Sequence, residues 1–128
     1  MKLLLDTHTF IWWDSQPNKL SQTAFRMLQN SSNTLLLSVA SIWEIQIKRQ
    51  SGKLTLNQSL LEIIIQQQQN NKIEMLPVSS DHVFGLDSLP TIHKDPFDRL
   101  LIAQANVENA VLVSCDPIIA QYPVNIAW

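Results

Sequence analysis

Four acidic residues stand at points of the sequence where they could act together. Asp6 and Asp116 each follow an apolar run typical of a buried strand, whereas Asp98 and Glu44 lie in helical patterns. Three or four carboxylates in one partly desolvated cleft would repel one another. Mg²⁺ or Mn²⁺ would relieve that repulsion, because both ions prefer carboxylate oxygens and suit phosphate substrates. With no candidate nucleophile beside a base, metal-activated water is the simplest chemistry that this set supports.

The stretch HKDPFDRLLIAQA, residues 93–105, holds two of the chain's aspartates within one helical turn. Asp95 followed by Pro96 is a typical helix start, and the helix dipole favours an acid at the position of Asp98. Helix capping alone does not require two acids so close together. His93 lies beside them, and we interpret it as structural or substrate-adjacent, because a metal-activated water needs no histidine base.

The other acids also have ordinary structural interpretations when each is taken alone. Asp6 and Asp116 stand where N-caps and turns commonly place aspartate. Glu44 could form an exposed i,i+4 pair with Lys48, worth only about 0.3–0.5 kcal/mol. Its apolar neighbours instead favour a covered position, where a buried carboxylate needs a partner. The metal hypothesis therefore depends on the acids coming together.

The order of apolar runs predicts how they would come together. Strand-like runs alternate with helical patterns, which implies a parallel sheet with helices on both sides and ligands outside the carboxyl ends of the strands. The runs are continuous, as expected for strands buried on both faces. A further helix follows Asp6. The predicted strands cover residues 2–5, 34–39, 73–78 and 110–114, with a short fifth at 124–127; the predicted helices cover 21–30, 39–50, 57–69 and 96–107.

Composition limits the remaining possibilities. A chain of 128 residues with 45% hydrophobic residues is expected to fold as a single domain over 1–128. A net charge of −2 excludes a broadly basic surface. Cys115 is the only cysteine, which fits a reducing cytoplasm, and we expect it to be small and buried. MKLLLD is too short for a membrane span or signal peptide. There is no zinc pattern, Walker A loop or dinucleotide fingerprint.

Several of these stretches together resemble the PIN-domain nucleases, and most closely the VapC-type toxins of bacterial toxin–antitoxin pairs. The matching stretches are LLLDTHTFIWW, SVASIWEIQIK, HKDPFDRLLIAQA and LVSCD, in the family's order over nearly the whole chain. The last departs from the family's pattern, in which T-x-D precedes an aromatic residue. The resemblance implies a three-layer α/β/α sandwich around a mainly parallel sheet of four to five strands.

The resemblance also implies Mg²⁺- or Mn²⁺-dependent cleavage of RNA, inhibition by a cognate antitoxin protein, and a homodimer. Carried over by motif, the catalytic set is Asp6, Glu44, Asp98 and Asp116. Of these, Asp6, Asp98 and Asp116 are the metal ligands that the resemblance implies. Auxiliary residues beside the acids are Thr7, Asp95 and Ser114. Candidate contacts to the RNA backbone are Lys48, Lys94 and Arg99, although ordinary solvated charge also explains each of them.

Two other functions are compatible with the sequence. One is an aspartate-based phosphotransfer domain, but a dehalogenase-type phosphatase needs an acid where His8 stands, and a receiver domain needs a lysine where LVSCD ends in Asp116. The other is a PIN fold kept as an RNA- or protein-binding module without a metal. Such a module should have lost some acids, and this chain retains all four.

Overall fold

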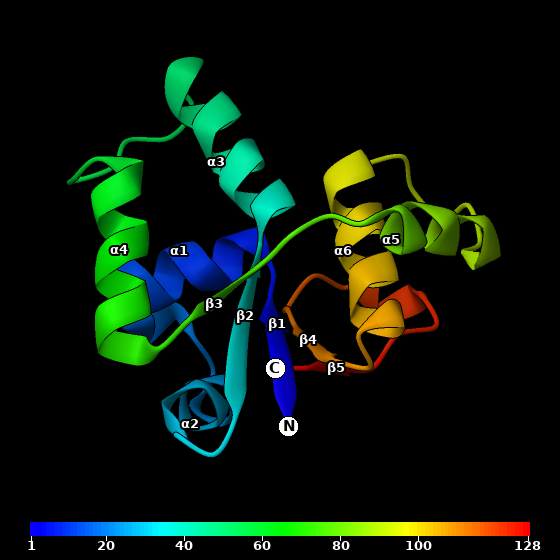
Figure 1. The fold of residues 1–128 in the computed structure, drawn as a ribbon, viewed down its shortest axis with the longest axis horizontal. Helices are drawn as coiled ribbons and strands as arrows, with labels where there is room; N and C mark the ends of the chain where they lie inside the picture. The colour runs from blue at the N-terminus through cyan, green and yellow to red at the C-terminus, as the bar shows by residue number, and fades with distance from the viewer.

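The computed structural model describes residues 1–128, and a five-stranded sheet lies at its centre (Figure 1). Its strands are ordered β3-β2-β1-β4-β5, and every neighbouring pair is parallel. This confirms the predicted fold class. The strands are β1 (Lys2–Leu5), β2 (Thr34–Ser38), β3 (Glu74–Leu76), β4 (Val111–Val113) and β5 (Ile126–Ala127).

Successive leucines of β1 face opposite sides of the sheet. Leu3 and Leu5 belong to one hydrophobic cluster and Leu4 to the other, and none of the three is exposed to solvent. Burying such a side chain contributes about 1.5–3 kcal/mol. Both faces of the central strand are therefore covered, which is why its sequence is continuously apolar rather than alternating.

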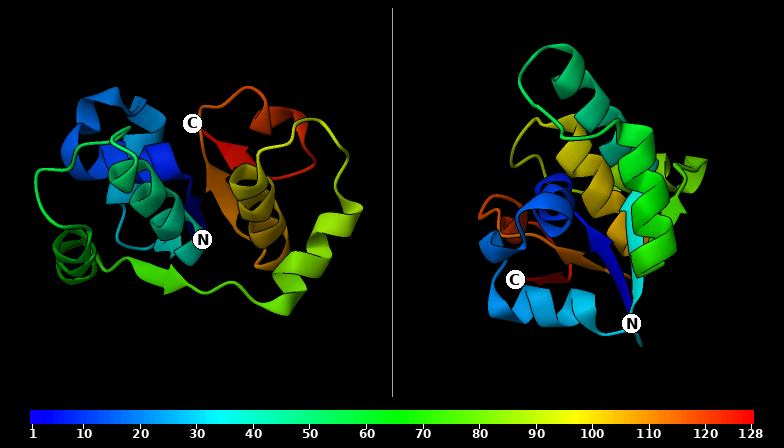
Figure 2. Two further views of the ribbon diagram at one scale, coloured as in Figure 1. Left: turned by 90° about the horizontal axis from the view of Figure 1, so that it is seen from above. Right: turned by 90° about the vertical axis from the view of Figure 1, so that its left-hand side faces the viewer.

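Helices cover both faces of the sheet (Figure 2). Side chains of α1, α2 and α4 pack into the first cluster, and those of α6 into the second. α3 begins directly after β2 and contacts both α1 and α6. None of these helices is both long enough and apolar enough to cross a membrane. The helices are α1 (Thr7–Ser15), α2 (Gln22–Gln29), α3 (Val39–Gln50), α4 (Leu60–Asn71), α5 (Ser80–Phe84) and α6 (Pro96–Val107).

The predicted strands and helices are present, with ends that differ by up to three residues. The largest difference is at α4, which begins at Leu60 rather than residue 57 because the Ser59 side chain caps it by accepting from the Glu62 N–H at 3.2 Å. The short helix α5 has no periodic pattern long enough to predict it. Cys115 is exposed, so the expectation of a buried cysteine is wrong. It lies beyond the end of β4, where neither face of the sheet covers it.

Candidate active site

A small cleft of about 200 Å³ opens at the carboxyl edge of the sheet and has no hydrophobic residue in its lining. The carboxyl ends of β1, β2 and β4 meet at this edge, because all three strands are parallel. All four predicted catalytic acids reach the cleft, although they come from separate segments of the chain. Its lining residues are Asp6, Thr7, His8, Glu44, Lys48, Asp95, Asp98 and Asp116.

Asp6 is both a helix cap and a wall of the cleft. Its carboxylate accepts from the Thr9 N–H at 2.8 Å and so starts α1. The Asp6 N–H and the Thr9 hydroxyl both donate to the Val113 carbonyl, at 3.2 and 2.9 Å. These bonds join the ends of β1 and β4, so the position of the Asp6 carboxylate is set by two strands at once.

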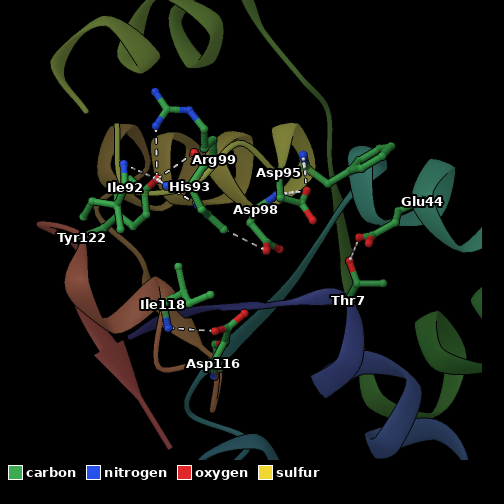
Figure 3. Close-up of polar contacts among 12 residues, drawn as sticks. Thr7, Glu44, Ile92, His93, Asp95, Asp98, Arg99, Asp116, Ile118 and Tyr122 are labelled. Carbon is green, nitrogen blue, oxygen red and sulfur yellow. Dashed lines mark hydrogen bonds and ion pairs between the residues drawn. The ribbon is translucent and has the colours of Figure 1, made fainter. Parts of the chain in front are cut away.

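Glu44 is buried, and its carboxylate has two partners, of which Figure 3 shows Thr7. The Thr7 hydroxyl donates to Oε1 at 2.6 Å, and the Lys48 ammonium lies 3.0 Å from Oε2. The Ser41 hydroxyl lies 3.1 Å from that of Thr7, so α1 and α3 are joined through this group. Thr7 therefore orients Glu44 toward the cleft, and Lys48 balances its charge.

Asp98 lies in the first turn of α6, and the helix cap positions it. The carboxylate of Asp95 accepts from the N–H groups of Phe97 and Asp98, at 2.9 and 3.2 Å. Burial and the charge of Asp95 raise the pKa of Asp98 to about 6, and the charges of Glu44 and Asp116 act in the same direction. A hydrogen bond with His93 opposes that shift. The carboxylates of Asp95, Glu44 and Asp116 therefore repel that of Asp98.

Tyr122, which belongs to none of the sequence motifs, organises the loop before α6. Its hydroxyl oxygen accepts from the N–H groups of Ile92 and His93 and from Arg99, at 3.3, 3.0 and 3.2 Å. The same oxygen lies 2.9 Å from His93 Nδ1, and His93 Nε2 lies 3.3 Å from the Asp98 carboxylate. Tyr122 thus connects through the His93 ring to Asp98 (Figure 3).

These bonds shift the protonation of two members of this network. Burial opposes ionisation of Tyr122, but the hydrogen bonds donated to its oxygen by His93, Arg99 and Ile92 lower its pKa to about 8. Burial acts to lower the pKa of His93, but its hydrogen bonds with Tyr122 and Asp98 raise it. These directions correspond to a His93 ring that donates from Nδ1 to the Tyr122 oxygen and from Nε2 to the Asp98 carboxylate.

Asp116 closes the cleft on the side of β4. Its carboxylate accepts from the Ile118 N–H at 2.8 Å, and its own N–H donates to the Ser114 hydroxyl at 3.1 Å. Figure 3 shows the carboxylates of Asp98, Glu44 and Asp116 turned toward the space between them. Ser114 therefore acts on the backbone of Asp116, as an auxiliary residue would, and does not itself line the cleft.

The donor set suits a hard cation that keeps some of its water, and not an ion enclosed entirely by side chains. No three acidic, histidine or cysteine side chains lie close enough together to enclose an ion as they stand. Mg²⁺ keeps several of its waters and uses one or two carboxylates, so it does not need such a cage. The polar lining and the mutual repulsion recorded in the raised pKa of Asp98 fit such an ion. A tetrahedral zinc site does not fit, because the donors are carboxylates rather than thiolates and imidazoles.

The three cations predicted to contact RNA have different surroundings. Lys48 is paired with Glu44 at the cleft, and Lys94 lies outside it in a neighbouring groove. Arg99 donates to the Pro90 carbonyl at 2.9 Å and to Tyr122 at 3.2 Å, so its guanidinium is used within the fold. Arg99 does not line the cleft, and we assign it a structural position.

Substitutions at Asp95 should separate helix capping from charge. Asp95→Ala removes the cap and should lower the free energy of unfolding by about 1 kcal/mol, whereas Asp95→Asn keeps a capping oxygen and should change it little. Asp95→Asn should also keep measurable activity, because the Asp98 carboxylate remains in place. Urea unfolding and a cleavage assay on both variants test this. A stable Asp95→Asn protein with no activity would contradict this division of roles.

Tyr122→Phe should destabilise the fold by about 1–3 kcal/mol, because it leaves the partly buried N–H groups of Ile92 and His93 without their acceptor. Tyr122 is only 4% exposed, so water cannot readily replace the lost oxygen. Thermal unfolding measures this loss. Ser32→Ala, which removes an exposed hydroxyl in a turn, is the control and should have little effect. Equal stability of the two variants would mean that Tyr122 holds nothing in place.

Comparisons with known proteins agree with this geometry. The family model of the PIN domain matches residues 3–125. VapBC2 from Rickettsia felis, solved bound to a DNA fragment from their promoter, aligns with a TM-score of 0.76 and 17% identity over 99% of this chain and 98% of that one. VapBC-1 from nontypeable Haemophilus influenzae aligns at 0.69 and 19%, over 99% and 97%. Identities this low establish a similar fold. No curated protein matches the chain.

Proposed function

This chain belongs to the PIN-domain family, and we propose that it is a Mg²⁺- or Mn²⁺-dependent endoribonuclease that acts as the toxin of a toxin–antitoxin pair. The observation that carries the proposal is the meeting of Asp6, Glu44, Asp98 and Asp116 in one polar cleft. Membership of the PIN family also argues against the alternative of a phosphotransfer domain. The retention of all four acids argues against a binding module that has lost its metal.

In this proposal the chain's own residues hold and orient the reacting groups. Asp6, Asp98 and Asp116 would hold the cation, and Glu44 would orient the attacking water. A bound divalent ion supplies a lowered pKa for that water and stabilises charge on the scissile phosphate. The Thr7 hydroxyl keeps Glu44 directed at the cleft, and Lys48 offsets its charge. In-line attack gives products with a 5′-phosphate and a 3′-hydroxyl.

The partners follow from the family and from similar structures. The Rickettsia felis and Haemophilus influenzae structures, and one from Salmonella typhimurium described as DNA-bound, are all VapBC assemblies. The Salmonella structure aligns with a TM-score of 0.68 and 17% identity, over 99% of this chain and 97% of that one. We infer that a separate antitoxin chain binds and inhibits this protein in the cytoplasm, and that the active form is a homodimer. Co-expression with the product of a neighbouring small reading frame tests the first point.

A cleavage assay tests the enzymatic activity directly. The purified chain should cleave RNA with Mg²⁺, and Asp6→Asn should reduce cleavage by at least about 100-fold, because metal sites lose 10–100-fold even when an outer partner is removed. Asparagine still caps a helix, so this variant should fold. Asp87→Asn, at an exposed aspartate outside the cleft, is the matched control and should stay active. Equal cleavage by all three proteins would overturn the proposal.

A further inference from the structure

A second groove, with a volume of about 410 Å³, adjoins the acidic cleft between α3 and the start of α6. The two share Glu44, Lys48 and Asp95 in their linings, so a chain that enters the cleft can continue into the groove. Of the four acids, only Glu44 also lines the groove. Its lining differs from that of the cleft in charge and in the presence of an aromatic ring.

Three lysines line this groove, out of nine lysines and arginines in a chain with a net charge of −2. Lys48 is neutralised by Glu44, but Lys53 and Lys94 are exposed and form no ion pair. Gly52 places the first of these: its φ of +78° lets the chain turn back after α3, and the Lys53 N–H then donates to the Lys48 carbonyl at 2.9 Å. The turn therefore places Lys53 at the wall of the groove.

Aromatic rings lie at the same place. Phe97 lines the groove, and the Trp43 ring packs edge-on against it, with 5.4 Å between centroids. Trp43 is 63% exposed, which is unusual for a tryptophan that has an aromatic neighbour to pack against. Its neighbour in sequence, Glu44, is buried in the cleft. An open aromatic face thus lies against Phe97, at the wall of the groove.

We propose that this groove binds a single-stranded segment of the substrate RNA, with its phosphates on Lys53 and Lys94 and a base stacked on Trp43. The assignment rests on the proposed nuclease function and names the side chains, Lys53, Lys94 and Trp43, that hold the RNA beside the acidic cleft. Cationic grooves with aromatic platforms are how proteins hold single strands, whereas the bases of a duplex are already stacked on one another. A protein partner fits less well, because lysine is depleted at the centres of protein interfaces.

Binding measurements in an Asp98→Asn background, where cleavage is removed, test the groove separately from catalysis. Fluorescence anisotropy would give the affinity for a labelled single-stranded RNA of about twelve nucleotides over a range of salt concentrations. Lys53→Gln/Lys94→Gln should bind more weakly and should lower the slope of log K against log salt by about 1.4, or 0.7 for each lost phosphate contact. Trp43→Leu should weaken binding about tenfold and leave that slope unchanged.

Lys72→Gln is the matched control, because Lys72 precedes β3 at the opposite edge of the sheet, and it should leave both the affinity and the slope unchanged. A duplex of the same sequence should compete poorly for the groove.

If the Asp6-dependent RNA cleavage occurs but the double lysine variant binds like Lys72→Gln, the groove assignment is overturned and the nuclease proposal stands. If Trp43→Leu changes the sedimentation coefficient and not the RNA affinity, this face binds protein and the assignment also falls. Failure of the parent protein to cleave or to bind RNA would overturn both proposals.

Discussion

Asp98→Asn should reduce RNA cleavage by at least about 100-fold and at the same time make the metal-free protein more stable at neutral pH. The two effects have one cause. Burial and the charge of Asp95 raise the pKa of Asp98 from 3.8 to about 6, so the fold disfavours the ionised carboxylate that the metal requires. Asparagine keeps the shape of the side chain and removes the charge. Each pKa unit corresponds to about 1.4 kcal/mol, and we expect a gain of roughly 1–2 kcal/mol at pH 7.5.

The raised pKa of Asp98 determines how its contribution to stability changes with pH. Below pH 3.8 Asp98 is protonated in both the folded and unfolded chain, and it imposes no penalty. As the pH rises from 3.8 to about 6, the unfolded chain loses this proton first, so the contribution of Asp98 to stability falls; above pH 6 the penalty is complete. In urea unfolding with a chelator present, the free energy of unfolding of Asp98→Asn relative to the wild type should therefore increase as the pH rises from 3.8 to about 6.

Asp87→Asn, an exposed aspartate outside the cleft, is the reference for that experiment and should follow the wild type at every pH. A lower stability for Asp98→Asn at pH 7.5 would contradict the prediction, because it would mean that the hydrogen bond from His93 outweighs the repulsion among the acids. Loss of activity without a gain in stability would likewise show that the carboxylates do not strain the metal-free fold.

Removal of divalent metal should abolish cleavage, and Mg²⁺ or Mn²⁺ should restore it and stabilise the fold. A cation held by Asp6, Asp98 and Asp116 would neutralise charge in a cleft where neighbouring carboxylates raise the pKa of Asp98. An ion present at 100 times its dissociation constant adds about 2.7 kcal/mol to the free energy of unfolding. At about 3 °C per kcal/mol for a chain of this size, Tm should rise by roughly 8 °C. Differential scanning calorimetry with and without Mn²⁺ measures this shift.

The same titration on variants identifies the ligands. Asp6→Asn and Asp98→Asn should each lose most of the shift in Tm, whereas Asp87→Asn should retain it. The affinity for Mn²⁺, measured by isothermal calorimetry, should fall in parallel. Undiminished cleavage in the presence of chelator would remove the metal from the mechanism. A shift in Tm that survives in Asp6→Asn and Asp98→Asn would place the ion somewhere else on the protein.

The acids of the cleft could be named from the sequence because of how a parallel sheet is built. Strands covered on both faces are continuous apolar runs, so the residues that end them, such as Asp6, can be read directly. Crossover connections bring those ends to one edge. The helix start at Asp95 and Pro96 could be read in the same way, since the capping residues are local in sequence.

The supporting residues could not be found in this way. Arg99 follows Asp98 directly, but adjacent helical residues differ by about 100° around the axis, and Arg99 consequently turns to Pro90 and Tyr122 instead of the cleft. Lys53 and Trp43 come to lie beside the start of α6 only because α3 packs against that helix. No pattern in the sequence expresses that packing.

By itself, the sequence determined the order of strands and helices, the edge of the sheet at which the acids end, and the dual position of Asp95 and Asp98 in one helical turn. These features depend on local patterns of polarity and capping, which neighbouring residues carry. Only the tertiary structure decided which oxygens face one another, that Tyr122 reaches Asp98 through His93, and that the acidic cleft opens into a lysine-lined groove. Those features arise from contacts between segments distant in the chain, and their geometry depends on how whole helices pack on the sheet.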